Sequence, residues 1–429
     1  MKNRFLITLF AVANFATAAL AQNSFSYKEF EAQVLDYSQH IKQSEAQREA
    51  MQSAMKLSKS AFYPAVDAAG LYQYRANESD LDFGTMAIPL DHNTFSTEIG
   101  VLQPIYAGGA VRTNYEASKI QSEMADRGVE LTTDNIIFAA EQSYWGAAAQ
   151  RAMYVTMCEY VDIITRLKST IQDKYDDGMV AKTELIQMES RLKEAELQRS
   201  NSHLAYRLAL QNLNSLMGRY PMEEITMRDS VITKMELPKY YSIAEIMERR
   251  PDYQISQLDV DYQQKQISLA SASYRPSLAV GFKETWGTQM INIDGSTLFN
   301  SNLYASLSVP IFRGGARKYQ RSVQTAILDT KISQAQDMED QITKEIANSW
   351  TELSENINQI DIAEENCTLA EENLELNTFS YNEGKLQILD VLSAQVNWIQ
   401  AYTNLIQSYY QQRISNATYQ KAIGARYND

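Results

Sequence analysis

The chain has 429 residues, enough for two or three ordinary domains, and a formal net charge of −14. That charge argues against a nucleic-acid binding protein, because phosphate backbones are bound by Lys and Arg. The three histidines, His40, His92 and His203, are scattered, and no His or Cys pair has the spacing of metal ligands. An enzyme is therefore not favoured, and we expect no catalytic residue, metal or cofactor.

The first 21 residues have the pattern of a secretory signal peptide. Lys2 and Arg4 precede an apolar run over 5–20, and small residues stand before Gln22. We expect residues 1–21 to be removed on export and, since Gln22 is not Cys, no lipid anchor on the mature chain. No later stretch approaches the roughly 20 apolar residues of a spanning helix. A protein held in a membrane would then have to cross it by strands, whose signal is weaker and alternating.

A first repeat is predicted over 22–218, beginning with a helix and followed by a strand pair at about 65–106. The strands, Ala65–Arg75 and Phe95–Tyr106, alternate less cleanly than a later pair, and a polar loop around Asn77–Asp82 joins them. The end of the second strand and the residues after it contain Pro104, Gly108 and Gly109. We expect these residues to join strand to helix as backbone devices.

A long helical hairpin is predicted over about 113–218. The segment is free of proline up to Pro221, and positions from Leu185 to Leu216 alternate steps of three and four, as in a coiled-coil seam. Met157, Ile164 and Ile171 recur every seven residues and extend the pattern upstream. The hairpin would reverse at a tip over 175–184, where Gly178 can adopt the left-handed conformation that ends a helix.

A linker over 219–240 is predicted to lead to a second repeat over 241–429. After a helix, its strand pair at about 277–312 carries a bulky apolar face and a small or polar one, with a turn near Asn292. The junction residues are Pro310, Gly314 and Gly315. A second hairpin would cover about 317–424, with its tip at 381–390 and its reversal at Gly384.

The two repeats are copies of one another. Tyr175–Gly218 reappears about 206 residues later as Tyr381–Gly424, and the same offset relates Gln103–Gly109 to Val309–Gly315. Four strands cannot close a barrel, since single barrels start at about eight strands. The sequence therefore predicts that closure requires other copies of the chain, and a conducting barrel favours three or more.

Four tip residues have two interpretations each. Tyr175 and Tyr381 are either ordinary seam residues or residues with a role of their own at the tip, and the pattern does not separate the two. Glu184 and Asp390 follow a turn, where an acidic residue also stabilises a helix N-terminus. Two further residues, Cys158 and Cys367, either form a disulfide or are small buried hydrophobes, and the second reading is favoured.

The duplicated motifs resemble those of the TolC-type outer membrane efflux protein family. The resemblance rests on the turns Gln103–Gly109 and Val309–Gly315, the tips at Tyr175 and Tyr381, and the stretch Asp390–Gln395. It covers essentially the whole mature chain in order and spacing.

This resemblance implies a mainly helical fold with a β-barrel part: a homotrimer with a twelve-stranded β-barrel in the outer membrane, continued by an α-helical barrel into the periplasm. It implies a passive, gated exit duct for drugs, other small molecules or exported proteins, working with a periplasmic adaptor protein and an inner membrane transporter. The alternative is a periplasmic coiled-coil adaptor or structural protein, which would not need two hairpins, each preceded by a strand pair.

The resemblance also implies roles at the tips, with departures. Tyr381 matches a tip tyrosine that bonds an acidic residue of the other repeat, here Glu184. The helix tips of the family meet the adaptor, so adaptor contact is an added hypothesis for Gly178 and Gly384 beside their role in reversing the helices. Leu386 stands where a relative has a basic residue, and Ser393 where it has a second lumenal aspartate. We therefore expect at most one acidic ring, from Asp390.

Overall fold

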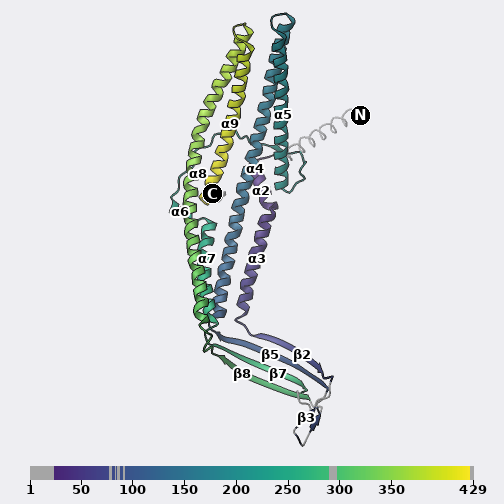
Figure 1. Cartoon of the computed structure of the whole chain (residues 1–429), viewed down its shortest axis with the longest axis vertical. Helices are drawn as coiled ribbons and strands as arrows, with labels where there is room; N and C mark the ends of the chain where they lie inside the picture. The colour runs from purple at the N-terminus through teal and green to yellow at the C-terminus, as the bar shows by residue number, and fades with distance from the viewer. Residues whose placement is uncertain are drawn as a thin grey trace, which may run out of the picture. The chain divides into compact units, whose positions relative to one another are not determined.

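The computed structural model describes residues 24–76, 80–82, 84, 87–89, 92–288 and 297–425 (Figure 1). The predicted signal peptide, the turn near Asn292 and part of the loop around Asn77–Asp82 lie outside these residues. Of the helices in the described part, none is both long and apolar enough to cross a bilayer.

The order of elements repeats along the chain, with helices, strands and then a long hairpin in each half. The elements of the first half are β1 (Ser24–Phe25), α2 (Tyr27–Tyr37), α3 (Gln39–Ser60), β2 (Ala65–Tyr74), β3 (Asp80–Asp82), β4 (Ala87–Pro89), β5 (Asn93–Ala107), α4 (Ala110–Asp176) and α5 (Lys182–Leu216). Those of the second half are β6 (Thr226–Met227), α6 (Ile243–Met247), α7 (Pro251–Ala272), β7 (Ser277–Thr288), β8 (Thr297–Ser308), α8 (Ala316–Asn382) and α9 (Ile388–Ala422).

The two hairpins are equal in length. Helices α4 and α8 each have 67 residues, and α5 and α9 each have 35. At 1.5 Å per residue, the longer helices measure roughly 100 Å. Both ends of each helix correspond at the offset found in the sequence, so the predicted hairpins are confirmed in both copies.

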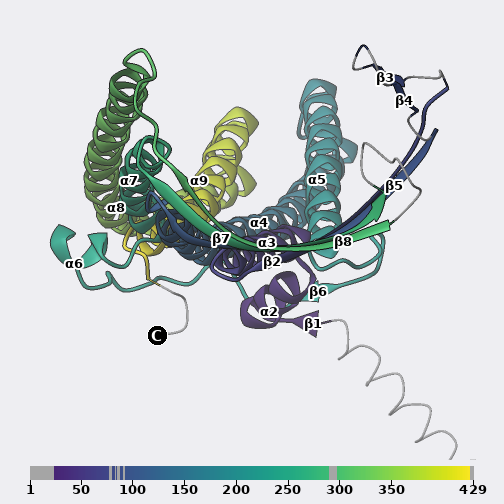
Figure 2. The same cartoon turned by 90° about the horizontal axis from the view of Figure 1, so that it is seen from below.

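The main sheet joins the two repeats. Its order is β2-β5-β7-β8, and each neighbouring pair is antiparallel. Each predicted strand pair forms, and β5 pairs with β7 to connect them. Strand β8 ends at Ser308, four residues short of the predicted end at about 312, because Pro310 has no N–H to donate to the ladder. Figure 2 shows the curvature of this sheet.

The alternation in the sequence becomes two chemically different faces of the sheet. Phe282 lies opposite Val101 on one side and Leu303 on the other, and these three apolar side chains share a face. Phe282 is 40% exposed and Leu303 78% exposed. Glu284 interrupts this face, and its Oε1 accepts a hydrogen bond of 2.9 Å from the hydroxyl of Ser301.

The strand-to-helix turns contain the predicted glycines in left-handed conformations. Gly108 and Gly109 have φ of 63° and 87°, and Gly314 and Gly315 have 59° and 77°. A Cβ on Gly108 would lie 2.3 Å from the carbonyl oxygen of Ala272, whereas Gly314 has no atom within 4 Å of such a Cβ. Pro104 does not belong to the turn as predicted. It lies inside β5, beside an irregularity that shifts the register of β5 against β7 by one residue.

By internal contacts the chain divides into two compact units that cut across the sequence repeats. Within the described residues, the hairpin unit comprises 24–44, 129–251 and 339–425, and the sheet unit comprises those between 45 and 128 and between 252 and 338. Each unit draws on both repeats, so the boundaries 22–218 and 241–429 describe the duplication and not the compact bodies.

The predicted linker 219–240 is held within the hairpin unit. Its short strand β6 pairs in parallel with β1 at the beginning of the described chain. Oδ2 of Asp229 accepts hydrogen bonds from the Tyr144 hydroxyl at 2.9 Å and from the backbone N–H of Tyr27 at 2.7 Å. Because Tyr144 is fully buried, Asp229 connects the linker and the N-terminal segment to the core of α4.

Candidate functional site at the helix tips

The two tips have the same backbone geometry. Gly178 has φ of 72° and Gly384 of 73°, and each donates its N–H to the carbonyl of the tyrosine three residues earlier. The next residues, Met179 and Lys385, donate to carbonyls five residues back, which completes a Schellman motif in each copy. Neither glycine has an atom within 4 Å of a built Cβ, so its conformation and not close packing requires glycine.

The predicted bond between the repeats is present. The Tyr381 hydroxyl donates to Oε2 of Glu184 at 3.2 Å, across the two hairpins. Tyr381 is only 4% exposed. Burial, and then the negative charge of Glu184, raise the pKa of Tyr381 to about 12, so its hydroxyl keeps the proton that it donates.

Lys174, in the last turn of α4, makes a second connection to Tyr381 that the sequence interpretation missed. Its Nζ donates to the carbonyl oxygens of Tyr381 at 3.1 Å and Asn382 at 3.3 Å. The same Nζ lies 4.3 Å from the centre of the Tyr381 ring, as a cation–π contact. The ammonium group therefore sits at the negative C-terminal end of α8, contributed by the other repeat.

The equivalent residues in the other copy behave differently. Tyr175 is partly buried against the apolar cluster behind the tips, and its hydroxyl makes no hydrogen bond within the described residues. Asp390 is exposed, and its Oδ2 accepts a hydrogen bond of 3.2 Å from the backbone N–H of Gln387, at the beginning of α9. The capping interpretation thus applies to Asp390, whereas Glu184 reaches across to Tyr381.

The two departures from the family pattern also lie at the tip. Leu386 is 39% exposed, and Ser393 is exposed with its hydroxyl bonded to the carbonyl of Leu389 at 2.8 Å. Asp390 is therefore an exposed acid in a turn of α9 where Ser393 contributes no charge.

An apolar cluster behind the tips packs the two hairpins against one another. It joins Ile164 and Ile171 of α4 to Leu185 and Met188 of α5, with residues of α8 and α9 that include Tyr381, Val391 and Trp398. Lys168, which stands between Ile164 and Ile171 on α4, forms an ion pair of 3.4 Å with Glu189. Four residues of α9 stand 206 positions after seam residues of α5 and are buried, namely Val391, Ala394, Trp398 and Ala401.

The cysteines and histidines do not form a second site. Cys158 and Cys367 are free thiols, and burial followed by the charge of Glu371 raises the pKa of Cys367. In the described residues no group of three or more His, Cys, Asp and Glu could hold a metal ion.

The two copies of the chain differ at Lys174. At the common offset its counterpart is Ser380, which is too short to reach the neighbouring helix end. A lysine in the last turn of a helix usually neutralises its own helix end, so the sequence alone did not indicate that Lys174 binds another helix.

A scan against family models matches the chain to one described as "Outer membrane efflux protein", over residues 32–219 and 242–425. The two matched segments correspond to the two repeats. Among curated proteins none matches the chain.

Solved structures of outer membrane channels share the fold. The CmeC outer membrane channel of Campylobacter jejuni has 18% identity and a TM-score of 0.82, with 93% of this chain and 85% of that chain covered. For the outer membrane protein VceC of Vibrio cholerae, the identity is 15%, the TM-score 0.80 and the coverage 93% and 96%. For the open state of the MtrE outer membrane channel of Neisseria gonorrhoeae, the identity is 16% and the TM-score 0.75, with 93% of this chain and 88% of that chain covered.

The family match covers most of the chain, and the duplicated fold agrees with it. It favours a channel over the alternative of a periplasmic adaptor, and it excludes an enzyme, since the family is one of outer-membrane efflux channels with a periplasmic helical part. The chain belongs to the outer membrane efflux protein family.

Proposed function

We propose that three copies of this chain form the exit duct of a pump or secretion complex, through a twelve-stranded barrel continued by a helical one. The observation that carries this proposal is the pair of sheet edges. Strands β2 and β8 stand at the two edges of the four-stranded sheet, and every residue of both is exposed. Long unpaired edges of this kind are complementary to the edges of further copies, and closure removes them.

Apolar rows on the hairpins support the same assembly. Ile362, Leu369 and Leu376 recur every seven residues on α8 and are 68%, 57% and 57% exposed. On α5, Leu197 and Leu204 are spaced likewise and are 61% and 57% exposed. Leu369 and Leu197 lie at similar distances along the chain from their tips, so the rows of neighbouring copies can pack in register.

The tip contacts support a gate. In the family the helix tips constrict the duct, and Tyr381, Glu184 and Lys174 join the two hairpins of one chain at this level. The MtrE structure captures the open state of that channel. We propose that this channel opens when the Tyr381 contacts break and the hairpins separate.

The same position suits contact with a periplasmic adaptor. Met179, beside Gly178, is 72% exposed, and Gly384 has no neighbour within 4 Å of a built Cβ. An adaptor and an inner membrane transporter would supply contact and energy, and the cargo would be drugs, other small molecules or exported proteins.

Cross-linking tests the arrangement directly. In a chain carrying Cys158→Ser and Cys367→Ala, the pair Leu197→Cys and Leu369→Cys should give a three-chain product with a short bismaleimide linker on intact cells. Val155→Cys with Leu369→Cys is the control, since Val155 is exposed on α4 but belongs to neither row. Native mass spectrometry of the purified protein should show three chains; two or four would refute the trimer.

A further inference from the structure

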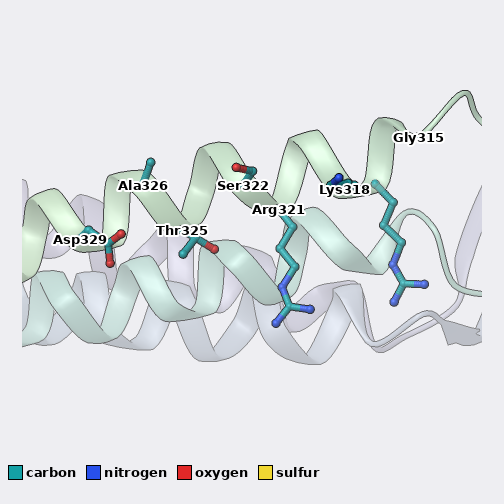
Figure 3. Close-up of a pocket in the computed structure, with 8 residues that line it drawn as sticks. Gly315, Lys318, Arg321, Ser322, Thr325, Ala326 and Asp329 are labelled. Atoms are coloured by element: carbon teal, nitrogen blue, oxygen red, sulfur yellow. The ribbon is translucent and has the colours of Figure 1, made fainter.

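The beginning of α8 carries a cluster of cations in a chain that is otherwise acidic. Arg317, Lys318 and Arg321 line one surface groove of about 750 Å³ together with Ser322 and Thr325 (Figure 3). From Gly295 to Leu328 the sequence contains no Asp or Glu. The groove therefore concentrates positive charge in a protein whose formal net charge is −14.

None of the three cations is paired with an acidic side chain within the described residues. None of them makes an ion pair or a side-chain hydrogen bond there, and Asp329, at the far end of the groove, is bonded to none of them. Two lysines elsewhere in the sheet unit are neutralised by acidic side chains. Lys265 lies 2.9 Å from Glu116, and Lys331 lies 2.7 Å from Asp259.

The cluster is also at the unfavourable end of its helix. Residues 317–321 belong to the first turns of α8, and the first turn contains no acidic residue. Cations near a helix N-terminus are repelled by the positive end of the dipole, whereas an anion there is stabilised. An external anion would thus be attracted by both the side chains and the helix.

The duplication shows that the cluster is specific to the second copy. At the common offset the counterparts of Arg317 and Arg321 are Val111 and Tyr115. Lys318 corresponds to Arg112, which is paired at 3.0 Å with Glu116, and Glu116 corresponds to Ser322. The second copy therefore has more cations and lacks the acid that neutralises the first.

The location indicates which anion is available. The groove begins directly after β8 and the turn that contains Ile311 and Phe312, which are 95% and 84% exposed. Tyr319, within the cluster, is 67% exposed. Exposed apolar and aromatic side chains followed by Lys and Arg mark the level where a strand leaves the hydrocarbon and meets phospholipid headgroups. In this family the helices are periplasmic, so the adjoining leaflet is the inner one.

We propose that the groove at the beginning of α8 binds the phosphate of an anionic glycerophospholipid in the inner leaflet of the outer membrane. Arg317, Lys318 and Arg321 provide the charge, and the hydroxyls of Ser322 and Thr325 are available as further donors. The site rests on the outer-membrane location of the family and not on the number of chains in the channel.

Lipid binding by the purified full-length protein tests the proposal. The delipidated protein in detergent is titrated with phosphatidylglycerol or phosphatidylcholine, and bound lipid is counted by native mass spectrometry. The triple variant Arg317→Gln, Lys318→Gln, Arg321→Gln should lose about a hundredfold in affinity for phosphatidylglycerol and nothing for phosphatidylcholine. Arg112→Gln, at the neutralised site of the first copy, should match the wild type.

Three further measurements test the role of charge and identify other occupants of the groove. The charge-conserving variant Arg317→Lys, Lys318→Arg, Arg321→Lys should keep its phosphatidylglycerol affinity, and an equal loss in both triple variants would overturn the proposal. Complete displacement of the lipid by inorganic phosphate would identify a free-anion site instead. If the Gln variant is folded by circular dichroism but has lost the wild-type oligomeric state, a second copy of the chain covers the groove and the proposal fails. If the protein binds phosphatidylglycerol but is not a trimer, the proposal of a lipid site stands and only the proposal of a trimer fails.

Discussion

Nζ of Lys174 lies 3.1 Å from the carbonyl oxygen of Tyr381 and 4.3 Å from the centre of its ring. The lysine thus holds the backbone and side chain of one residue on the neighbouring hairpin, while Glu184 holds the hydroxyl of that residue. Three side chains connect the hairpins at the level of the proposed gate. Because Ser380 replaces Lys174 in the other copy, this contact cannot recur at every hairpin boundary of a closed channel.

Removing the Tyr381 hydroxyl should favour the open state. A hydrogen bond to a charged acceptor contributes about 1.5–3 kcal/mol, so Tyr381→Phe should raise the open population by about tenfold or more. The measurement is the conductance of the purified channel in planar bilayers. Tyr175→Phe is the matched control, because the Tyr175 hydroxyl has no partner in the described chain. Unchanged conductance in Tyr381→Phe would show that Tyr381 is only a packing residue.

The gate should also respond to alkaline pH. The pKa of Tyr381 is raised to about 12 by burial and by Glu184, from about 10 in an unfolded chain. The protonated hydroxyl is the bonded form, so its contribution is complete below about pH 10 and is lost as pH rises through about 12. Wild-type conductance should be flat from about pH 7 to 9 and rise above about pH 11. The response should be absent in Tyr381→Phe, and an identical rise in both proteins would assign it to other groups.

Substitutions of Lys174 should distinguish the contribution of its charge to the closed tip from the contribution of its packing. Lys174→Met keeps most of the aliphatic stem but removes the donor, and it should cost about 1–2 kcal/mol of the closed state. Lys174→Arg retains the charge and should restore most of the closed population. Bilayer conductance measures both, and thermal unfolding checks that neither variant loses its fold. Equal conductance in all three proteins would exclude a role in holding the tip.

Asp390 should affect selectivity more than stability. The amide oxygen of Asp390→Asn can still accept the hydrogen bond from the N–H of Gln387, so the start of α9 should change by less than about 1 kcal/mol. The exposed charge is lost, and the reversal potential in a salt gradient should shift toward weaker cation preference. Asp390→Ala should lose both cap and charge. Unaltered selectivity in both variants would place the cation-selective ring elsewhere.

Sequence patterns predicted the long elements well because their signals are local and repeated. Windows without proline and seams such as Val391 to Ala401 locate the hairpins, and the bulky face around Phe282 identifies the strands. The contact of Tyr381 with Glu184 was expected from the resemblance to the TolC-type family and not from periodicity or from the duplication.

The contacts that the sequence did not predict join residues far apart in the chain, and they involve very short strands or single side chains. The parallel pairing of Phe25 with Met227 involves strands of two residues, which are too short for periodicity to be detected. Asp229 is an acid in an irregular segment, and only the fold brings it to Tyr144. Lys174 likewise satisfies a helix end that is distant in sequence. Such contacts depend on where the hairpins lie after packing, which propensity and pattern do not specify.

Substitutions at Gly384 and Gly108 should distinguish a requirement for the left-handed backbone conformation from a requirement for space around the residue. At Gly384, with φ of 73° and no atom within 4 Å, Ala should cost about 1–2 kcal/mol from backbone strain alone, and Asn should cost less because it tolerates the left-handed region. At Gly108 a Cβ would lie 2.3 Å from the carbonyl oxygen of Ala272, so Ala and Asn should both be severe. Thermal unfolding of the four variants in detergent measures the difference. If Asn rescues Gly108 as well as it rescues Gly384, the close approach to Ala272 does not constrain the strand-to-helix turn, and left-handed geometry is the whole requirement in both places.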